Sequence, residues 1–105
     1  FVLAATPLRL LDLLGLGDDD DAGAPSDSHE RVRCLFGATR YLVIDEADQM
    51  AGKADMSRQV DRILEFVRAR SARLERECLF SATLPRRAAA KCHEWIARPR
   101  VTVKA

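Results

Sequence analysis

Three acidic side chains, Asp45, Glu46 and Asp48, directly follow a short apolar run in the segment RYLVIDEADQM, residues 40–50. Carboxylates this close together repel one another, and such repulsion is usually tolerated where a cation is bound or a proton is moved. In an open α/β sheet, ligands bind beyond the carboxyl ends of the strands, where Asp45 would lie. The pattern therefore predicts that Asp45 faces a magnesium and phosphate site and that Glu46 reaches a water aligned with the terminal phosphate. The plainer alternative is that these acids only end a strand and begin a turn.

A second polar group ends another apolar run, since Ser81 and Thr83 lie in LFSATLP, residues 79–85. We expect these hydroxyls at the same sheet edge as the acids, where they can hydrogen-bond the neighbouring carboxylates and respond to the nucleotide. Thr83 could also cap a helix that begins at Pro85. The two roles are compatible, because one side chain can serve each in a different state.

An alternation of two sequence periods predicts the elements that position these groups. Continuous or β-branched apolar runs, typical of strands covered on both faces, lie at 1–5, 41–44, 78–80 and 101–103. Three helices are predicted: after Pro7, across 57–70 with Ser57 capping the first turn, and from Pro85 to Pro99. Apolar residues at helical spacing in the last two are Val60, Ile63, Leu64, Val67, Ala88, Cys92, Trp95 and Ile96. The alternation predicts an α/β fold with a parallel sheet and right-handed crossovers.

Residues 15–31 interrupt this alternation. Their Gly, Asp, Pro and Ser content, with four successive acids, predicts a flexible acidic insertion at the surface. Asp18 to Asp21 could instead bind magnesium, but adjacent side chains on a flexible loop cannot hold the required octahedral arrangement. A solvated insertion is therefore favoured.

Composition limits the classes of protein that remain. The chain has 105 residues, enough for one core at most, and a formal net charge of +1, which does not by itself indicate a nucleic-acid partner. No apolar run of about 18 residues occurs, so no membrane span is predicted. Three cysteines without a CxxC spacing, Cys34, Cys78 and Cys92, are typical of reduced thiols in an intracellular protein. The start at Phe1 suggests a piece of a longer chain.

Three motifs in order resemble those of the DEAD-box ATP-dependent RNA helicases of superfamily 2. VIDEAD at 43–48 resembles their Walker B motif, SAT at 81–83 resembles their third motif, and TPLRL at 6–10 is similar to their TPGRL motif. The resemblance covers nearly the whole chain. It implies that residues 1–105 are a partial ATP-binding domain, the C-terminal half of a RecA-like (P-loop NTPase) parallel-sheet lobe, because no Gly-rich phosphate loop with Lys occurs in them.

The resemblance also implies roles for individual residues. Asp45 would hold the Mg²⁺ of ATP through water, and Glu46 would act as general base on the attacking water. Asp48 would contact the coupling motif, and so link hydrolysis to RNA strand separation; that motif consists of Ser81, Ala82 and Thr83.

RNA binding is assigned by the resemblance to Thr6, Pro7 and Arg9. A helix that starts near Pro7 presents free backbone N–H groups, which together with an Arg can bind phosphates without reading bases. Leu8 stands where the family usually has Gly, which puts a close approach of RNA to that backbone in doubt.

The implied function is RNA-stimulated ATP hydrolysis coupled to RNA unwinding or ribonucleoprotein remodelling, with the 105 residues alone inactive. The non-Gly TPxRL motif and ERECLFSATLP look most like the helicases of small-subunit ribosomal RNA maturation, so pre-ribosomal partners and a nucleolar or nuclear location are expected, with the cytoplasm also open. Two alternatives stay open. One is a DNA-directed superfamily 2 motor, and the other is a degenerate lobe kept as a non-catalytic binding module.

Overall fold

The computed structural model of the chain describes residues 1–17, 26–96 and 102–103. Two strands pair in parallel, with Tyr41 opposite Arg76 and Ile44 opposite Leu79. The predicted α/β fold with parallel strands is therefore confirmed. The elements in chain order are α1 (Pro7–Leu14), α2 (Asp27–Phe36), β1 (Tyr41–Ile44), α3 (Ala47–Ala51), α4 (Ala54–Arg70), β2 (Arg76–Leu79) and α5 (Arg86–Trp95).

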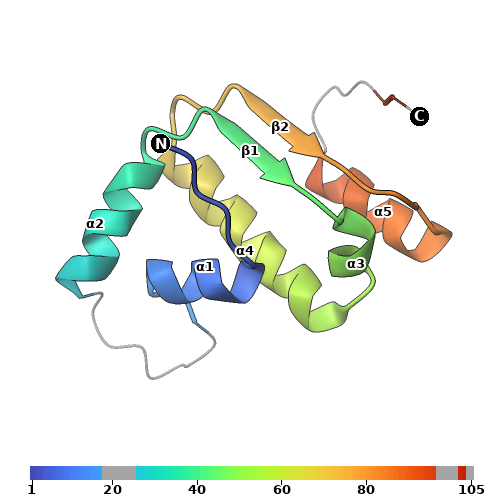
Figure 1. Cartoon of the computed structure of the whole chain (residues 1–105), viewed down its shortest axis with the longest axis horizontal. Helices are drawn as coiled ribbons and strands as arrows, with labels where there is room; N and C mark the ends of the chain where they lie inside the picture. Colours follow the sequence, from blue (N-terminus) through green and yellow to red (C-terminus); the bar gives the residue numbers. More distant parts are fainter. Residues whose placement is uncertain (18–25, 97–101, 104–105) are drawn as a thin grey trace.

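The helices separate into two groups along the strands. Figure 1 shows α1 and α2 at one end of the molecule and α3 and α5 at the other, toward which both strand arrows point. Helix α4 runs behind the strands from one group to the other. It is also the connection between β1 and β2, so the parallel pair is formed through a helical crossover, as parallel strands require.

Two hydrophobic clusters form the interior. The strand-end cluster joins β1, α3, α4 and α5, and consists of Ile44, Ala47, Val60, Leu64, Cys92 and Trp95. The α1–α2 cluster joins those two helices to α4, and consists of Leu11, Leu14, Phe36, Ile63 and Val67. Helix α4 contributes to both because its apolar positions cover two adjoining faces. No helix in the described part of the chain is long and apolar enough to cross a membrane.

The apolar face predicted for α4 is confirmed, but the predicted first residue of the helix is not. Helix α4 begins at Ala54, with Lys53 as the N-cap residue, one turn before the predicted start. The prediction that Ser57 caps the helix is wrong, because Ser57 lies inside the helix and is buried. Serine is a preferred N-cap residue, but here the Ser57 backbone N–H donates to the Lys53 carbonyl at 2.8 Å, so the helix has already begun before it.

The predicted strand at 1–5 is also wrong. Residues 1–5 form no strand, and Phe1 and Val2 are 82% and 97% exposed. A strand exists only where a neighbour completes its ladder, and the one strand pair in the described part of the chain is β1 with β2. Of the strand predicted at 101–103, Thr102 and Val103 are described and form no strand, and Val101 lies outside the described residues.

The predicted insertion at 15–31 is wrong at its C-terminal end. Helix α2 begins at Asp27, and Ser26 and His29 form a capping box: Ser26 Oγ accepts from the His29 backbone N–H, and His29 Nδ1 accepts from the Ser26 N–H. Asp18 to Asp21 lie outside the described residues. The helix was not predicted because only its polar first half lies within 15–31, whereas Val32, Leu35 and Phe36, which have helical spacing, follow that segment.

Candidate functional site

Asp45 and Glu46 lie at the carboxyl end of β1, directly after the buried Ile44, and both are exposed. Asp45 Oδ1 accepts a hydrogen bond of 2.9 Å from the Glu46 backbone N–H. Glu46 has φ 52° and ψ 44°, and it is the one non-glycine residue with positive φ among those described. This left-handed conformation is unfavourable for a side chain such as Glu, and strain of this kind is concentrated at functional sites.

The backbone of Phe80 makes hydrogen bonds to the residues on either side of Asp45 and Glu46. Its N–H donates to the carbonyl of Ile44 at 2.8 Å, and its carbonyl accepts from the N–H of Ala47 at 3.1 Å. Phe80 directly precedes Ser81, so the chain that carries the hydroxyl residues also shapes the backbone of Asp45 and Glu46. The two carboxylates therefore depend on the neighbouring strand segment for their position.

Asp48 and Thr83 meet across the two strand ends. The Thr83 hydroxyl donates to Asp48 Oδ2 at 2.6 Å, while the Ser81 hydroxyl donates to the Thr83 carbonyl. The hydrogen bond from Thr83, with a smaller contribution from Ser81, lowers the pKa of Asp48 below its ordinary value. No described side chain caps α5, so the Thr83 hydroxyl serves Asp48 and not that helix. Ala82, between the two hydroxyls, is exposed.

Helix α3 brings Asp48 to this position. Its first residue, Ala47, is fully buried in the strand-end cluster and packs the short helix onto the rest of that cluster. Cys92 of α5 is buried beside it, and burial raises the pKa of the Cys92 thiol, with the negative charge of Asp48 as a second cause. Asp48 is therefore within electrostatic range of α5 as well as of the segment that leads into that helix.

Thr6, Pro7 and Arg9 lie at the start of α1, on the other side of α4. Thr6 is the N-cap residue, with no side-chain capping bond from its hydroxyl, and Pro7 occupies the first turn. Thr6 and Arg9 are exposed, and Leu8 is 49% exposed. The structure thus places these residues on the surface at a helix start, as the sequence predicts, in an element that packs on α4 and α2.

The carboxylates at the strand ends can supply only part of the coordination of a magnesium ion. Among the described residues, no group of three or more His, Cys, Asp or Glu could hold a metal ion by itself. Magnesium usually keeps several waters and is held by one or two carboxylates together with substrate phosphates. The single exposed carboxylate of Asp45 fits that arrangement, in which phosphate and water oxygens supply the remaining ligands.

Three features of the site were missed by the sequence reasoning. These are the short helix α3, the left-handed backbone at Glu46, and the two backbone bonds of Phe80. The last two leave no sequence signal, because Glu is not a residue type that favours a left-handed backbone and backbone hydrogen bonds do not depend on residue type. For α3, the Gly52 that follows it is a helix-stop signal that could have indicated a helix end.

Comparison with known protein families gives one match that covers most of the chain. The model of the family described as DEAD/DEAH box helicase matches residues 2–91. The matched range includes the start of α1, the acids after β1 and the hydroxyl residues after β2. No solved structure matches the chain.

Proposed function

The chain belongs to the DEAD/DEAH box helicase family, and on that premise we propose that it forms part of an ATP-dependent RNA helicase. The proposal depends above all on the 2.6 Å hydrogen bond between Thr83 and Asp48, which joins the ends of the two strands. At the same edge lie the carboxylates that a nucleotide hydrolase needs. The α/β architecture with its parallel strand pair agrees with part of a RecA-like lobe.

Two carboxylates are proposed to serve hydrolysis. Asp45 would orient the waters around the magnesium ion of ATP, and that ion would neutralise charge on the phosphates. Glu46 would accept the proton of the attacking water. Its left-handed backbone directs the side chain away from the regular course of β1, and the two hydrogen bonds of Phe80 hold that backbone in place.

Coupling to RNA is proposed for Asp48 with Ser81, Ala82 and Thr83. A carboxylate that accepts from a hydroxyl on a second strand can report movement of one strand end to the other. Thr6, Pro7 and Arg9 would bind RNA through its phosphates, because the start of α1 combines backbone N–H groups that the Thr6 side chain does not cap with the exposed residue Arg9. Such contacts recognise backbone shape more than sequence.

The test is the variant Glu46→Gln in the native gene product that carries these residues. That protein is required because no Gly-rich loop followed by Lys and Ser or Thr occurs in the 105 residues. We expect ATP binding to be retained and RNA-stimulated turnover to fall about 10²- to 10⁴-fold, the usual contribution of a general base. Glu65→Gln, which makes the same change at an exposed position on α4, is the control and should keep normal turnover.

The same assay separates the alternatives. An ATPase stimulated by RNA and not by DNA supports the proposed helicase, whereas preferential stimulation by DNA would indicate a DNA-directed motor. A wild-type protein that binds no ATP would indicate a non-catalytic module. Unchanged turnover in Glu46→Gln would remove Glu46 from the role of base.

The cellular process proposed is ribosomal RNA maturation, on the basis of the TPLRL and ERECLFSATLP segments. In that process the protein would be found in the nucleolus with pre-ribosomal particles. Fractionation of cell extracts with detection of the native protein tests this proposal, and exclusive recovery away from pre-ribosomal fractions would contradict it.

A further inference from the structure

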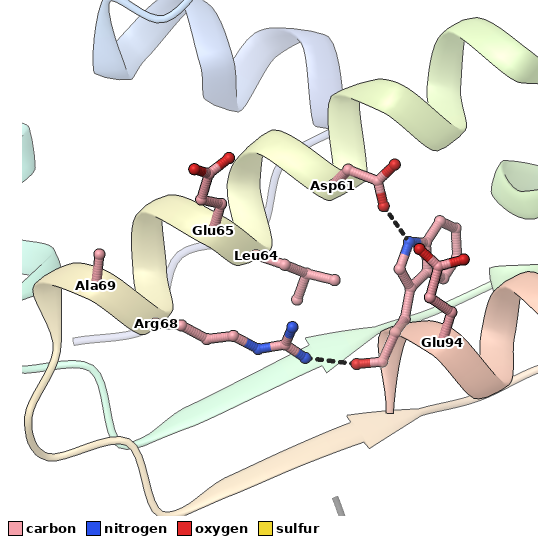
Figure 2. Close-up of a pocket in the computed structure, with 7 residues that line it drawn as sticks. Asp61, Leu64, Glu65, Arg68, Ala69 and Glu94 are labelled. Carbon is pink, nitrogen blue, oxygen red and sulfur yellow. Dashed lines mark hydrogen bonds between the residues drawn. The ribbon is translucent and has the colours of Figure 1, made fainter. Parts of the chain in front are cut away.

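One carboxylate of α4 binds two side chains of α5. Asp61 Oδ2 accepts from Lys91 Nζ at 2.8 Å, and Asp61 Oδ1 accepts from Trp95 Nε1 at 2.8 Å. Figure 2 shows the second of these bonds reaching across from α4 to the indole. Lys91 and Trp95 are one helical turn apart, so a single carboxylate restrains both the rotation of α5 about its axis and its position along it.

A second residue of α4 holds the end of α5. Arg68 donates to the backbone carbonyl of Trp95, as Figure 2 also shows, and its Nε lies 2.7 Å from Glu77 Oε1. The side chain of Glu77 on β2 is only 7% exposed, so this ion pair is shielded from water on one side. The last turns of α5 are therefore attached to α4 by polar groups as well as by the buried indole, and Glu77 of β2 holds the Arg68 side chain that makes one of these bonds.

The position of α5 determines where Thr83 lies. Only Leu84 and Pro85 separate Thr83 from the first residue of α5, and Pro85 has its φ confined at −61°. Helix α5 also packs against α3, which carries Asp48, through the strand-end cluster. A rotation or slide of α5 would therefore displace Thr83 relative to Asp48, with little chain between them to absorb the movement.

We infer that Asp61 is a positioning residue for the hydrogen bond between Asp48 and Thr83. It touches neither of them and acts through α5, which it holds by Lys91 and Trp95. Its effect on unwinding rests on the proposed function, whereas its effect on the contact between the two strand ends does not. The competing explanation is that Asp61 only adds stability to the packing of α4 and α5.

The first test compares Asp61→Asn, Thr83→Ala and the double variant in the native gene product. The Asp61 side chain is 42% exposed at an open hollow of about 510 Å³ between α4 and α5, so Asn there stays hydrated and the variant should fold. RNA strands separated per ATP hydrolysed should fall about tenfold in each single variant, the size expected when a hydrogen bond to a charged group is lost. The double variant should show no further loss, and additive losses would overturn the inference.

Two control variants test the competing explanation, in which Asp61 only stabilises the packing of α4 and α5. Glu94→Gln makes the matched change at the other carboxylate that Lys91 contacts, whose side chain is 68% exposed. Val67→Ala destabilises the same helix from the α1–α2 cluster. Both should keep the normal number of strands separated per ATP. An equal loss in Val67→Ala would show that Asp61 has a structural role only.

Hydrogen exchange of the same proteins tests the inference without an assay of ATP hydrolysis or unwinding. The amides to follow are Ala47, which donates to the Phe80 carbonyl, and Ala88, which donates to the Pro85 carbonyl. Asp61→Asn should accelerate both more than Val67→Ala does. Acceleration confined to the last turn of α5 would overturn the inference. If the wild type shows no RNA-stimulated turnover, the proposed function fails while this result still stands.

Discussion

The two sides of α4 are held together by different interactions. On the strand-end side, backbone hydrogen bonds of β1, β2 and Phe80 place the acids, and the strand-end cluster lies beneath them. On the α1–α2 side, contacts made by side chains hold the helices together. Arg33 Nε donates to the Leu14 carbonyl at 2.7 Å, Phe36 meets Phe66 edge to face with ring centroids 6.1 Å apart, and Arg33 and Arg70 both lie over the Phe66 ring.

The difference bears on how each side tolerates change. Backbone bonds do not depend on residue type, so the backbone at Asp45 and Glu46 keeps its position unless a packed residue beneath it is lost. The contact of Asp48 with Thr83 depends on side chains instead. The α1–α2 side depends on individual side chains, because an arginine satisfies carbonyls at the end of α1 that the helix itself leaves without donors. Among the described elements, only α4 contributes buried residues to both clusters, with Val60 and Leu64 in one and Ile63 and Val67 in the other, so we expect any effect of one side on the other to pass through α4.

The largest effect is expected from removing a large buried ring on either side. Trp95→Ala and Phe36→Ala should each lower the free energy of unfolding by about 3–5 kcal/mol, the usual cost for these rings. Trp95→Ala should also accelerate exchange of the Ala47 amide, since Trp95 and Ala47 belong to the same cluster, whereas Phe36→Ala should leave it unchanged. Urea denaturation and hydrogen exchange measure the two quantities. Equal acceleration at Ala47 in both variants would show that the two sides are not separable.

A smaller effect should follow from Arg33→Met, which keeps the apolar stem and removes the guanidinium. The Leu14 carbonyl loses a charged donor, and the Arg33 side chain is 14% exposed, so about 1.5–3 kcal/mol of stability should be lost. The amide of Leu16, which donates to the Leu11 carbonyl at the end of α1, should exchange faster. Arg31→Met, at an exposed position of the same helix, is the control and should change stability by less than about 0.5 kcal/mol.

The smallest effects concern the pH dependence of stability, which has opposite directions for two contacts of the strand-end side. These are the contact of Lys91 with Asp61 and that of Asp48 with Thr83. The hydrogen bond to Asp61 raises the pKa of Lys91, so its contribution to stability is complete below the ordinary lysine value of about 10.4 and is lost as pH rises through the raised pKa. The lowered pKa of Asp48 gives a contribution that is present above the ordinary value of about 3.9 and is lost as pH falls.

Variants isolate these two contributions. The stability difference between wild type and Lys91→Met should shrink at alkaline pH, and that between wild type and Asp48→Asn should shrink at acidic pH. Thermal denaturation across the pH range measures both. A difference that stays constant with pH would show that the residue in question keeps its ordinary pKa in the folded protein.

The sequence by itself determined the features that depend on local pattern. The helical spacing of Val60, Leu64 and Val67 specifies which face of α4 is buried, because burial repeats with the period of the element. The continuous apolar run of YLVI predicted a strand, but not that Tyr41 and Val43 would be exposed. The three motifs indicated the family and the residues that lie at the strand ends. These features are readable because each residue's own neighbours along the chain decide them.

Only the tertiary structure decided the features that depend on partners distant in the chain. The apolar run at 1–5 forms no strand, although its composition favours one, because strand formation requires a paired neighbour. The left-handed Glu46 depends on the backbone of Phe80, and the role inferred for Asp61 depends on Lys91, 30 positions away. No local pattern carries such information, since a carboxylate on a helix surface has the same sequence signature whether it meets water or a neighbouring helix.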